Sequence, residues 1–512
     1  MSAWRQVDRS ARGARIGALR AAMPSAVGAA MVSCLTALAA AGQSGEAPSP
    51  AEAPAASKMP RIRVAADGRT FETVDGRPFV PLGVTYYRPG TGWAPQVWKQ
   101  FDAEATRADF ARMKQLGVNC VRVFLSFGSF LTKPDALDPD GLAKFDQFLE
   151  IAESAGVYVH PTGPDHWEGL PDWARGDHIA EPRLLAALER FWELLAARYR
   201  ARTVIFAYDL RNEPQVAWET PPMRDGWNGW LAARYGSRDA QATAWGVPAE
   251  TIGWGRQSAP DPKTGSAHAL VDYQSYREEV ADEWTRRQVA AIRRADPDAM
   301  VTVGLIQWSV PALLPGVRHY AAFRPERQAK LLDFLEIHFY PLADGFYHYA
   351  SQEAEDRNLA YLESVVREAA APGKPVVIGE FGWYGGGRLT IGGDHPAATE
   401  AQQARWCRQV VETTRGWACG WLNWGFYDQP EARDVSQLTG LVTADGTTKA
   451  WGEEFSRLAA EWSARRIPPP PAVVRPALDW RRATIDLDAG RQFREEYLRA
   501  FLDQRPGQRA GD

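Results

Sequence analysis

Several residue types are too scarce in this 512-residue chain to support common classes of protein. Four cysteines are too few for a disulfide scaffold. There are eight histidines, and neither of the metal-site motifs CxxC and HExxH occurs. The histidines are scattered without metal-ligand spacing. The net charge of −4 gives no basic surface for nucleic acid. We therefore expect no metal, no cofactor and no nucleic-acid partner.

The cysteines leave one question open. Cys120 lies inside an apolar run, where a buried free thiol is the usual state. Cys407 and Cys419 would be able to pair only in an oxidising compartment. Tryptophan is abundant by contrast, with 21 copies, and its large flat ring suits either a core or a binding groove.

The first 60 residues resemble an export signal followed by a spacer. Five arginines lie within residues 1–20, and an Ala-rich apolar run follows at 21–41, ending in small residues. This order predicts a signal peptide at 1–41 and a secreted or periplasmic protein. A membrane anchor and a lipoprotein modified at Cys34 are alternatives. Residues 42–60, rich in Ala, Pro, Ser and Glu, predict a linker.

From residue 61 the chain alternates between short apolar runs and amphipathic segments. Residues 61–80 carry two turn signals, ADGR and VDGR, and predict a β-hairpin. Eight strand-like runs follow, at 81–87, 118–126, 157–162, 205–214, 300–305, 334–341, 375–382 and 420–428. Helical patterns lie between them, at 102–116, 141–155, 183–200, 272–295, 355–370 and 399–415. Eight such units predict a closed (β/α)8 TIM barrel over 61–465, with an open doubly wound sheet as the alternative.

Two further segments interrupt or follow the barrel pattern. Residues 215–268, between the fourth and fifth strands, form a long Trp-rich insertion that we expect to build one wall of a cleft. PPPP at 468–471 marks a break. Apolar residues at helical spacing in 488–503 then predict a C-terminal helix that packs on the barrel within 466–512.

Polar side chains follow the apolar strands at the end where a barrel enzyme places its chemistry. They are Asn212 and Glu213 on the fourth strand, His338 and Tyr340 on the sixth, Glu380 on the seventh and Trp424 on the eighth. Strands four and seven face each other across a barrel. Two facing carboxylates are able to hydrolyse a glycosidic bond, one as proton donor and the other as nucleophile.

At this point the sequence resembles the clan A glycoside hydrolases, most closely the cellulase and mannanase family five, over roughly 61–460. Asn212-Glu213-Pro214 is similar to that family's strand-four motif, and Glu380 in IGEFGW to its strand-seven nucleophile. The resemblance implies that Glu213 is the acid/base and that Asn212 binds the sugar 2-hydroxyl. His338-Phe339-Tyr340 is similar to the family's HxY element, whose Tyr hydroxyl contacts the nucleophile.

The same resemblance implies roles for three other positions. Arg122 in VRVF matches a strand-two arginine that keeps the nucleophile ionised, with Asp209 as the alternative partner. Trp424 matches the platform under the reacting sugar, and Trp383 is a second candidate for stacking on a sugar ring. The family usually has a histidine after strand three; His166 is the candidate here, with His160 as the alternative. The GLPDW and WLAARYG segments resemble β-galactosidases of the same clan.

The sequence therefore predicts a secreted, retaining glycoside hydrolase that cleaves β-linked oligo- or polysaccharides, similar to an endo-β-1,4-glucanase or mannanase. An exo-acting β-galactosidase or β-mannosidase is the first alternative, and a non-catalytic carbohydrate-binding relative is the second. A barrel enzyme of another class would need a Schiff-base lysine or a metal cluster at the strand ends, which the sequence does not offer. We expect a monomer that contacts a membrane only if Cys34 carries a lipid.

Overall fold

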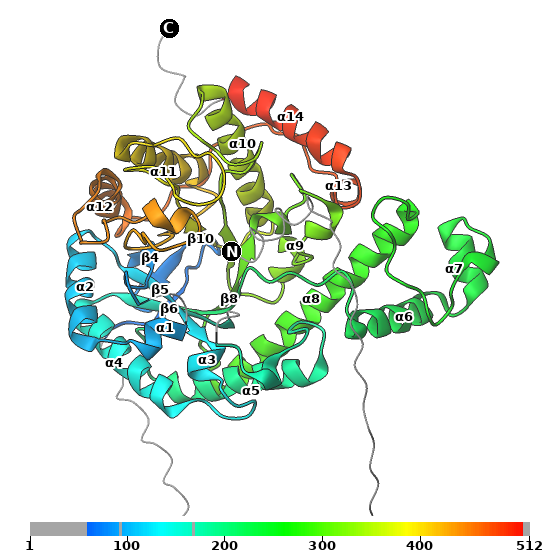
Figure 1. The fold of residues 1–512 in the computed structure, drawn as a ribbon, viewed down its shortest axis with the longest axis horizontal. Helices are drawn as coiled ribbons and strands as arrows, with labels where there is room; N and C mark the ends of the chain where they lie inside the picture. Colours follow the sequence, from blue (N-terminus) through cyan, green and yellow to red (C-terminus); the bar gives the residue numbers. More distant parts are fainter. Residues whose placement is uncertain (1–58, 92–94, 166–168, 505–512) are drawn as a thin grey trace, which may run out of the picture. The chain divides into compact units, whose positions relative to one another are not determined.

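The chain folds around a closed barrel of eight parallel strands, shown end-on in Figure 1. A computed structural model describes residues 59–91, 95–165 and 169–504. Around the barrel the strands follow the order β10-β11-β4-β5-β6-β7-β8-β9. They are β4 (Leu82–Thr85), β5 (Cys120–Ser126), β6 (Tyr158–Asp165), β7 (Tyr208–Asn212), β8 (Val301–Ile306), β9 (Leu335–His338), β10 (Val376–Phe381) and β11 (Trp421–Asn423).

Each of the eight predicted apolar runs overlaps one of these strands, so the prediction of a (β/α)8 barrel is confirmed. Every residue of β5, β6, β8 and β10 is buried, as expected where helices cover one face and the barrel interior the other. Most of the strands are shorter than the runs that predicted them, but β6 continues past its run to Asp165 and β8 is as long as its run. The run at 420–428 contains only three strand residues, because its remaining residues belong to the loop above the barrel.

Helices surround the strands and cover their outer faces. The helices that alternate with the strands or close the ring are α2 (Ala103–Gln115), α4 (Pro139–Ala155), α5 (Pro182–Tyr199), α8 (Ala267–Ala295), α9 (Pro325–Gln328), α10 (Gln352–Ala370), α11 (Glu400–Thr414) and α12 (Ala450–Trp462). Two short helices, α1 (Pro95–Lys99) and α3 (Phe127–Phe130), lie in loops. Local sequence fixes several helix starts. Asp102 caps α2, and Thr399 with Gln402 forms a capping box on α11, which satisfies backbone N–H groups at those ends.

A small antiparallel sheet closes the N-terminal end of the barrel. Its strands β1 (Ile62–Val64), β2 (Phe71–Thr73) and β3 (Pro78–Phe79) pair in that order, so the two predicted turns produce three strands. The ring of Phe71 packs edge-on against Phe206 and Phe334, each at a centroid distance of 5.2 Å. Phe79 packs against Tyr158 at 4.9 Å. These rings lie at the starts of β6, β7 and β9 and seal that end with apolar surface.

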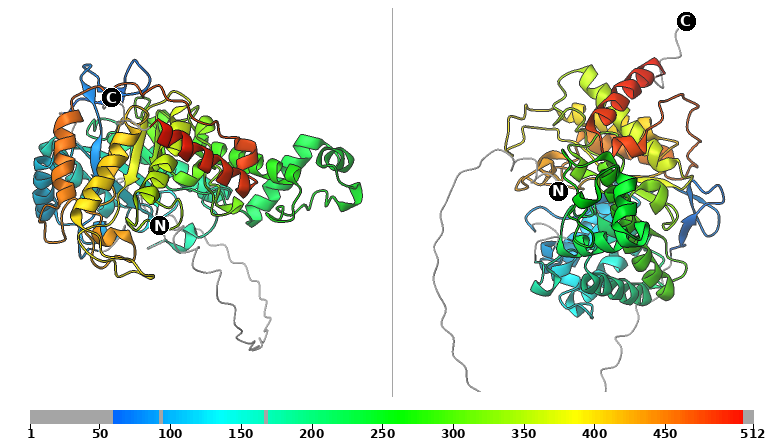
Figure 2. Two further views of the ribbon diagram at one scale, coloured as in Figure 1. Left: turned by 90° about the horizontal axis from the view of Figure 1, so that it is seen from above. Right: turned by 90° about the vertical axis from the view of Figure 1, so that its right-hand side faces the viewer.

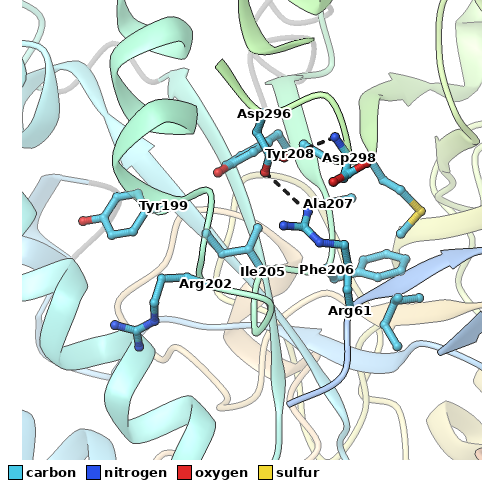
Figure 3. A pocket seen from close by; sticks show the side chains of 12 residues that line it. Arg61, Tyr199, Arg202, Ile205, Phe206, Ala207, Tyr208, Asp296 and Asp298 are labelled. Carbon is cyan, nitrogen blue, oxygen red and sulfur yellow. Dashed lines mark hydrogen bonds and ion pairs between the residues drawn. The ribbon is translucent and has the colours of Figure 1, made fainter. Parts of the chain in front are cut away.

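A shallow pocket lies between this sheet and the barrel, and Figure 3 shows it from close by. Arg61 enters it from the N-terminal side, with Nη1 3.3 Å from Oδ2 of Asp296. The Arg61 guanidinium also donates to the carbonyl of Arg200 at 2.7 Å. The polar side chains described above lie at the opposite, C-terminal ends of the strands, where barrel enzymes have their active sites. We therefore interpret this pocket as structural and not as the active site.

The insertion after β7 extends sideways as an arm (Figures 1 and 2). It contains α6 (Pro221–Tyr235) and α7 (Arg238–Trp245), followed by the long helix α8 that returns to the barrel. The arm has its own apolar core, in which Trp227 packs against Trp230, Tyr273 and Tyr276. The expectation that this insertion builds a wall of the cleft was wrong for α6 and α7, because they project away from the barrel.

The C-terminal segment packs on the helical layer. It contains α13 (Trp480–Ala483) and α14 (Leu487–Asp503), and α14 lies along α10 (Figure 1). The buried carboxylate of Glu363 on α10 accepts from Arg475 at 2.7 Å and from the Tyr497 hydroxyl at 2.9 Å. Because Glu363 and Arg475 are almost fully buried, this pair fixes the segment against the barrel.

Two other predictions concern the cysteines and the N-terminal segment. Among the described residues, Cys120, Cys407 and Cys419 are all buried and free, so the last two do not form a disulfide. Cys34 and the predicted signal peptide and linker fall almost wholly outside the described residues. Within those described ranges, no helix combines the length and the apolar character needed to span a bilayer.

Candidate active site

The two glutamates that ended predicted strands meet at the C-terminal end of the barrel. Glu213 directly follows β7, and Glu380 lies near the end of β10. One carboxylate oxygen from each, together with a nitrogen of His338, lies within 4.8 Å of the other two atoms. Glu213 has a backbone φ of 46°, in the left-handed region that costs a non-glycine residue free energy. The fold thus holds this carboxylate in a strained position.

Glu380 is held by one cation and one hydroxyl. Arg122 Nη1 donates to Oε1 at 2.5 Å, and the hydroxyl of Tyr340 donates to Oε2 at 2.9 Å. Burial raises the pKa of Glu380, and the positive charges of His338 and Arg122 act against this rise. The pKa of Tyr340 is raised well above its usual value by burial and by the charge of Glu380, so this hydroxyl keeps its proton and donates.

His338 lies between the two carboxylates. Its Nδ1 is 3.3 Å from Oε1 of Glu213 and 3.6 Å from Oε1 of Glu380. Burial lowers the pKa of His338, but the charge of Glu380 and the hydrogen bonds to Glu213 and Glu336 raise it to about 9. The imidazole is therefore charged at neutral pH. On Glu213, burial raises the pKa, but the hydrogen bond and charge of His338 are among the contributions that bring it down to about 2.

Asn212 is oriented from two sides. Its side-chain oxygen accepts from Nη2 of Arg122 at 2.9 Å, and its backbone N–H donates to Asp165 at 3.1 Å. Because the side-chain oxygen already accepts from Arg122, the amide nitrogen is the part of this side chain that can donate to a ligand. Arg122 also contacts Asp209 through Nη2 at 2.8 Å. Both partners considered for Arg122 from the sequence are thus present.

The two candidate tryptophans have different surroundings. Trp424 donates from Nε1 to the hydroxyl of Ser436 at 2.8 Å, and its ring lies beside Tyr87 at a centroid distance of 6.0 Å. Trp383 donates to the carbonyl of Tyr347 at 2.7 Å and packs against Phe346 at 4.5 Å. Trp383 and Trp424 are both almost fully buried, with relative exposures of 0% and 1%, so neither presents an open ring face in this structure.

The sequence offered two candidates for the histidine expected after strand three. His166 lies outside the described residues. The alternative, His160, is fully buried within β6, where it contacts the Ala207 carbonyl and Glu336 at 2.7 and 2.8 Å. His160 therefore lies deeper in the barrel than Glu213 and Glu380.

Sequence reasoning missed Glu336. This carboxylate lies in β9 and is fully buried, with one oxygen 2.8 Å from His160 Nε2 and the other 3.2 Å from His338 Nε2. Arg122 Nε lies 3.4 Å away. One signal was available: residues two apart on a strand share a face, so Glu336 had to point into the same interior as His338.

Two groups in the described part of the chain have the side chains a metal ion would need. They are His160, Asp209 and Glu336, and Glu213, His338 and Glu380. In both, Arg122 already contacts carboxylates, reaching Asp209, Glu336 and Glu380. A guanidinium within 3.4 Å of these oxygens supplies the positive charge that a metal ion would bring.

A (β/α)8 barrel with two facing carboxylates at its strand ends, one of them beside Arg and Tyr, defines a glycoside hydrolase. Comparison with known proteins agrees. The family model described as Cellulase (glycosyl hydrolase family 5) matches residues 85–429, which is more than half of the chain. The protein belongs to this family.

Curated relatives match only part of their length. A β-xylosidase from Phanerodontia chrysosporium is 32% identical over 127 residues, covering 22% of this chain and 26% of the relative. The β-galactosidase BgaA from Thermus sp is 26% identical over 256 residues, covering 43% of this chain and 37% of the relative. The matched part thus spans about a quarter of the first relative and little more than a third of the second.

Solved structures share the fold. The exo-β-1,4-mannosidase Op5Man5 from Opitutaceae bacterium strain TAV5 has a TM-score of 0.56 at 19% identity, covering 78% of this chain and 62% of that one. The GH5_18 protein from Streptomyces cattleya, in complex with Manβ1-4GlcNAc, has a TM-score of 0.60 at 19% identity, covering 82% and 91%. A β-galactosidase from Halorubrum lacusprofundi has a TM-score of 0.57 at 18% identity, covering 75% and 58%.

Proposed function

We propose that this protein hydrolyses β-glycosides with retention of configuration, with Glu380 as nucleophile and Glu213 as acid/base. The observation that carries the proposal is the spacing of the two carboxylates, whose nearest oxygens lie within 4.8 Å. Retaining enzymes place these groups about 5–5.5 Å apart, whereas inverting enzymes separate them by about 6.5–9.5 Å to admit water. The short spacing supports direct attack by Glu380.

The surroundings of each carboxylate support its role in two steps. In the first step Glu380, oriented by Arg122 and Tyr340, attacks the anomeric carbon. The bond to the leaving oxygen breaks, and that oxygen takes the proton of Glu213. In the second step Glu213 removes a proton from water, the resulting hydroxide adds to the anomeric carbon, and Glu380 leaves as a carboxylate. The sugar hemiacetal is released with its original configuration.

Asn212 and Trp424 are the proposed contacts to the reacting sugar. The amide nitrogen of Asn212 is a donor suited to a sugar hydroxyl next to the anomeric carbon. Such a hydrogen bond adds stability where charge develops in the transition state. Trp424, held by Ser436 and almost fully buried in this structure, would have to be uncovered to stack on the sugar.

Within this class we favour exo-action on a short β-linked glycan, with a β-mannoside or β-galactoside as the terminal sugar. The named relatives support this choice, since they include an exo-β-1,4-mannosidase, a complex with Manβ1-4GlcNAc and β-galactosidases. The endo-glucanase or mannanase assignment is the second candidate, supported by the family description. The arm of α6 and α7 supports neither, because it extends away from the barrel.

One substrate screen tests these points. Nitrophenyl β-mannoside, β-galactoside, β-xyloside and β-glucoside, together with β-1,4-linked oligosaccharides and polymers, would be hydrolysed and the products measured by length and by anomeric NMR. Retention with release of monosaccharides supports the proposal. First appearance of the inverted anomer overturns the role of Glu380, and medium-length products from polymers favour endo-action.

We also propose that residues 1–41 direct export. The arginines followed by an Ala-rich apolar run support this. Mass spectrometry of the protein recovered from a periplasmic fraction would show a new N-terminus near residue 42, whereas an intact Met1 there would contradict cleavage.

A further inference from the structure

The pairing between β8 and β9 stops just before the tyrosine that contacts the proposed nucleophile. Its last residue pair joins Ile306 to His338, and Tyr340 lies two positions beyond the end of β9. The following residue, Pro341, has no N–H to donate. The backbone N–H and carbonyl of Tyr340 therefore need partners from outside the sheet.

Gln307 supplies both of these partners. This residue directly follows β8 and begins the short 3₁₀ helix η5 (Gln307–Ser309). Its side-chain Oε1 accepts from the Tyr340 N–H at 2.7 Å, and its Nε2 donates to the Tyr340 carbonyl at 3.1 Å. Because an N–H only donates and a carbonyl only accepts, these partners define the orientation of the amide. The side chain thus takes the place of a residue in a neighbouring strand.

The surroundings of the Gln307 amide are buried and neutral. The side chain is fully buried, and its Nε2 also lies 3.5 Å from the hydroxyl of Tyr361 on α10. The ring of Tyr361 packs against Phe339 at a centroid distance of 5.3 Å. Burial raises the pKa of Tyr361, so this hydroxyl carries no charge at neutral pH. Gln307 therefore acts on Tyr340 through geometry and not through charge.

Tyr340 carries this constraint to the reaction centre. Its hydroxyl donates to Oε2 of Glu380 at 2.9 Å, and the N–H of the preceding Phe339 donates to the Glu380 carbonyl at 2.9 Å. The position of a tyrosine hydroxyl depends on the backbone dihedral angles of that residue, because the rigid ring places the oxygen far from Cα. A small rotation at Tyr340 would therefore move the hydroxyl away from Oε2.

We propose that Gln307 is a positioning residue for the reaction, which fixes the Tyr340 backbone so that its hydroxyl stays on Oε2 of Glu380. This inference rests on the proposed function, in which Glu380 attacks the anomeric carbon. A hydrogen bond donated to a carboxylate favours its charged form, and the attack needs that form in the correct alignment. Arg122 holds the other oxygen, Oε1, so the two oxygens of the nucleophile are held independently.

A purely structural role would have a different consequence, and Asn358 on α10 provides an example of it. Its Oδ1 accepts from the Ala343 N–H at 3.0 Å, and its Nδ2 donates to the Ala354 carbonyl at 2.8 Å. Asn358 is almost fully buried and holds the same loop three residues beyond Tyr340. The side chain of Ala343 is a methyl group, which has no hydrogen to donate to a carboxylate. Asn358 is therefore the matched control for Gln307.

A double-variant cycle with Tyr340→Phe tests the proposal in the full-length enzyme. Gln307→Met keeps the length of the side chain and removes both hydrogen bonds. We expect it to lower kcat/KM for a dinitrophenyl β-glycoside by about 10²-fold. The acidic limit of the pH profile should rise, because Glu380 loses a donor that favours its charged form. In Tyr340→Phe the same substitution should have almost no effect, since the hydroxyl that it displaces is already absent.

The control variant Asn358→Leu should lower the urea midpoint and leave kcat/KM and the acidic limit unchanged. The inference is overturned if Gln307→Met causes an equal loss of activity on both backgrounds, or if it lowers stability alone. If Gln307→Met does not fold, Gln307→Asn, whose amide is one methylene shorter, enters the same cycle. Absence of any β-glycosidase activity in the wild type would instead refute the proposed function.

Discussion

The two ends of the barrel are filled in opposite ways. At the N-terminal end, Phe71 and Phe79 of the small sheet pack against Phe206 and neighbouring rings. At the C-terminal end, the interior contains Arg122 and the carboxylates around it. Both ends are buried, yet the N-terminal end is packed mainly by apolar rings, with the ion pair of Arg61 and Asp296 beside them, and the C-terminal end is built from ions. Equal burial therefore does not mean an equal contribution to stability.

The apolar N-terminal end stabilises the fold, whereas the charged C-terminal end holds the groups proposed to react. Apolar rings stabilise a fold in proportion to the surface they remove from water, and they need no special backbone. The charged end loses hydration free energy, and Glu213 adds the cost of a φ of 46°. Such costs are typical of sites where the fold holds groups ready to react. The following predictions test this separation, from the largest expected effect to the smallest.

Removing the proposed nucleophile should abolish activity while sparing the fold. We expect Glu380→Ala to lower kcat by about 10⁴-fold or more, with thermal unfolding unchanged or raised because one buried charge is lost. Hydrolysis of a nitrophenyl β-glycoside and a melting curve measure the two effects. A variant that keeps a tenth of the activity would contradict the assignment.

Removing the acid/base should produce an effect that depends on the leaving group. Glu213→Ala is expected to slow hydrolysis of a natural disaccharide by about 10²–10⁴-fold. A dinitrophenyl glycoside should be less affected in the first step, because its leaving group needs no proton. Comparing kcat/KM for the two substrates tests this, and an equal loss on both would argue against Glu213 as proton donor.

At the N-terminal end of the barrel, a substitution should lower stability and leave activity unchanged. Phe71→Ala removes a ring that contacts both Phe206 and Phe334, and we expect the free energy of unfolding to fall by about 3–5 kcal/mol. The folded fraction should keep a wild-type kcat. Val74→Ala is the matched control, because Val74, in the turn directly after β2, is 50% exposed and its replacement should have almost no effect on urea unfolding. A fall in kcat for Phe71→Ala would show that the ends are coupled.

The charge on His338 should make stability depend on pH. Its pKa rises from 6.5 to about 9 on folding, so its contribution is present below pH 6.5 and is lost as pH rises through 9. The difference of 9 − 6.5 = 2.5 units corresponds to at most about 3 kcal/mol. Urea unfolding between pH 6 and pH 10 should show a steeper loss in the wild type than in His338→Gln. Parallel curves would contradict a charged His338.

The ion pair at the N-terminal end should matter least. Arg61 is partly exposed and lies 3.3 Å from Asp296, so Arg61→Ala is expected to cost about 1 kcal/mol or less. Kinetic constants should not change. A loss comparable to that of Phe71→Ala would mean that ions, too, carry stability at this end.

The sequence was sufficient for the barrel and for the strand ends. Continuous apolar runs such as VVIGEF reveal buried parallel strands, and the polar residue at each tip marks the face where loops meet. Such patterns are local, so Glu213 and Glu380 could be placed near each other before any coordinates were known.

Contacts between strands were harder to foresee. Arg122 might have paired with Asp209 or with Glu380, and only the folded barrel shows that one guanidinium reaches both. Glu336 was overlooked because its importance depends on His160, 176 residues away in the chain. The direction of the arm also could not be predicted from the sequence. Trp-rich amphipathic helices predict an apolar core, but they do not show where that core lies relative to the barrel.

Gly379 has a consequence for how this site can evolve. The Glu336 carboxylate occupies the volume that any side chain at position 379 would need. A lineage therefore gains access to other residues at 379 only after position 336 has been replaced by something smaller. The two positions should change in a fixed order, so Glu336 constrains the residue next to the proposed nucleophile.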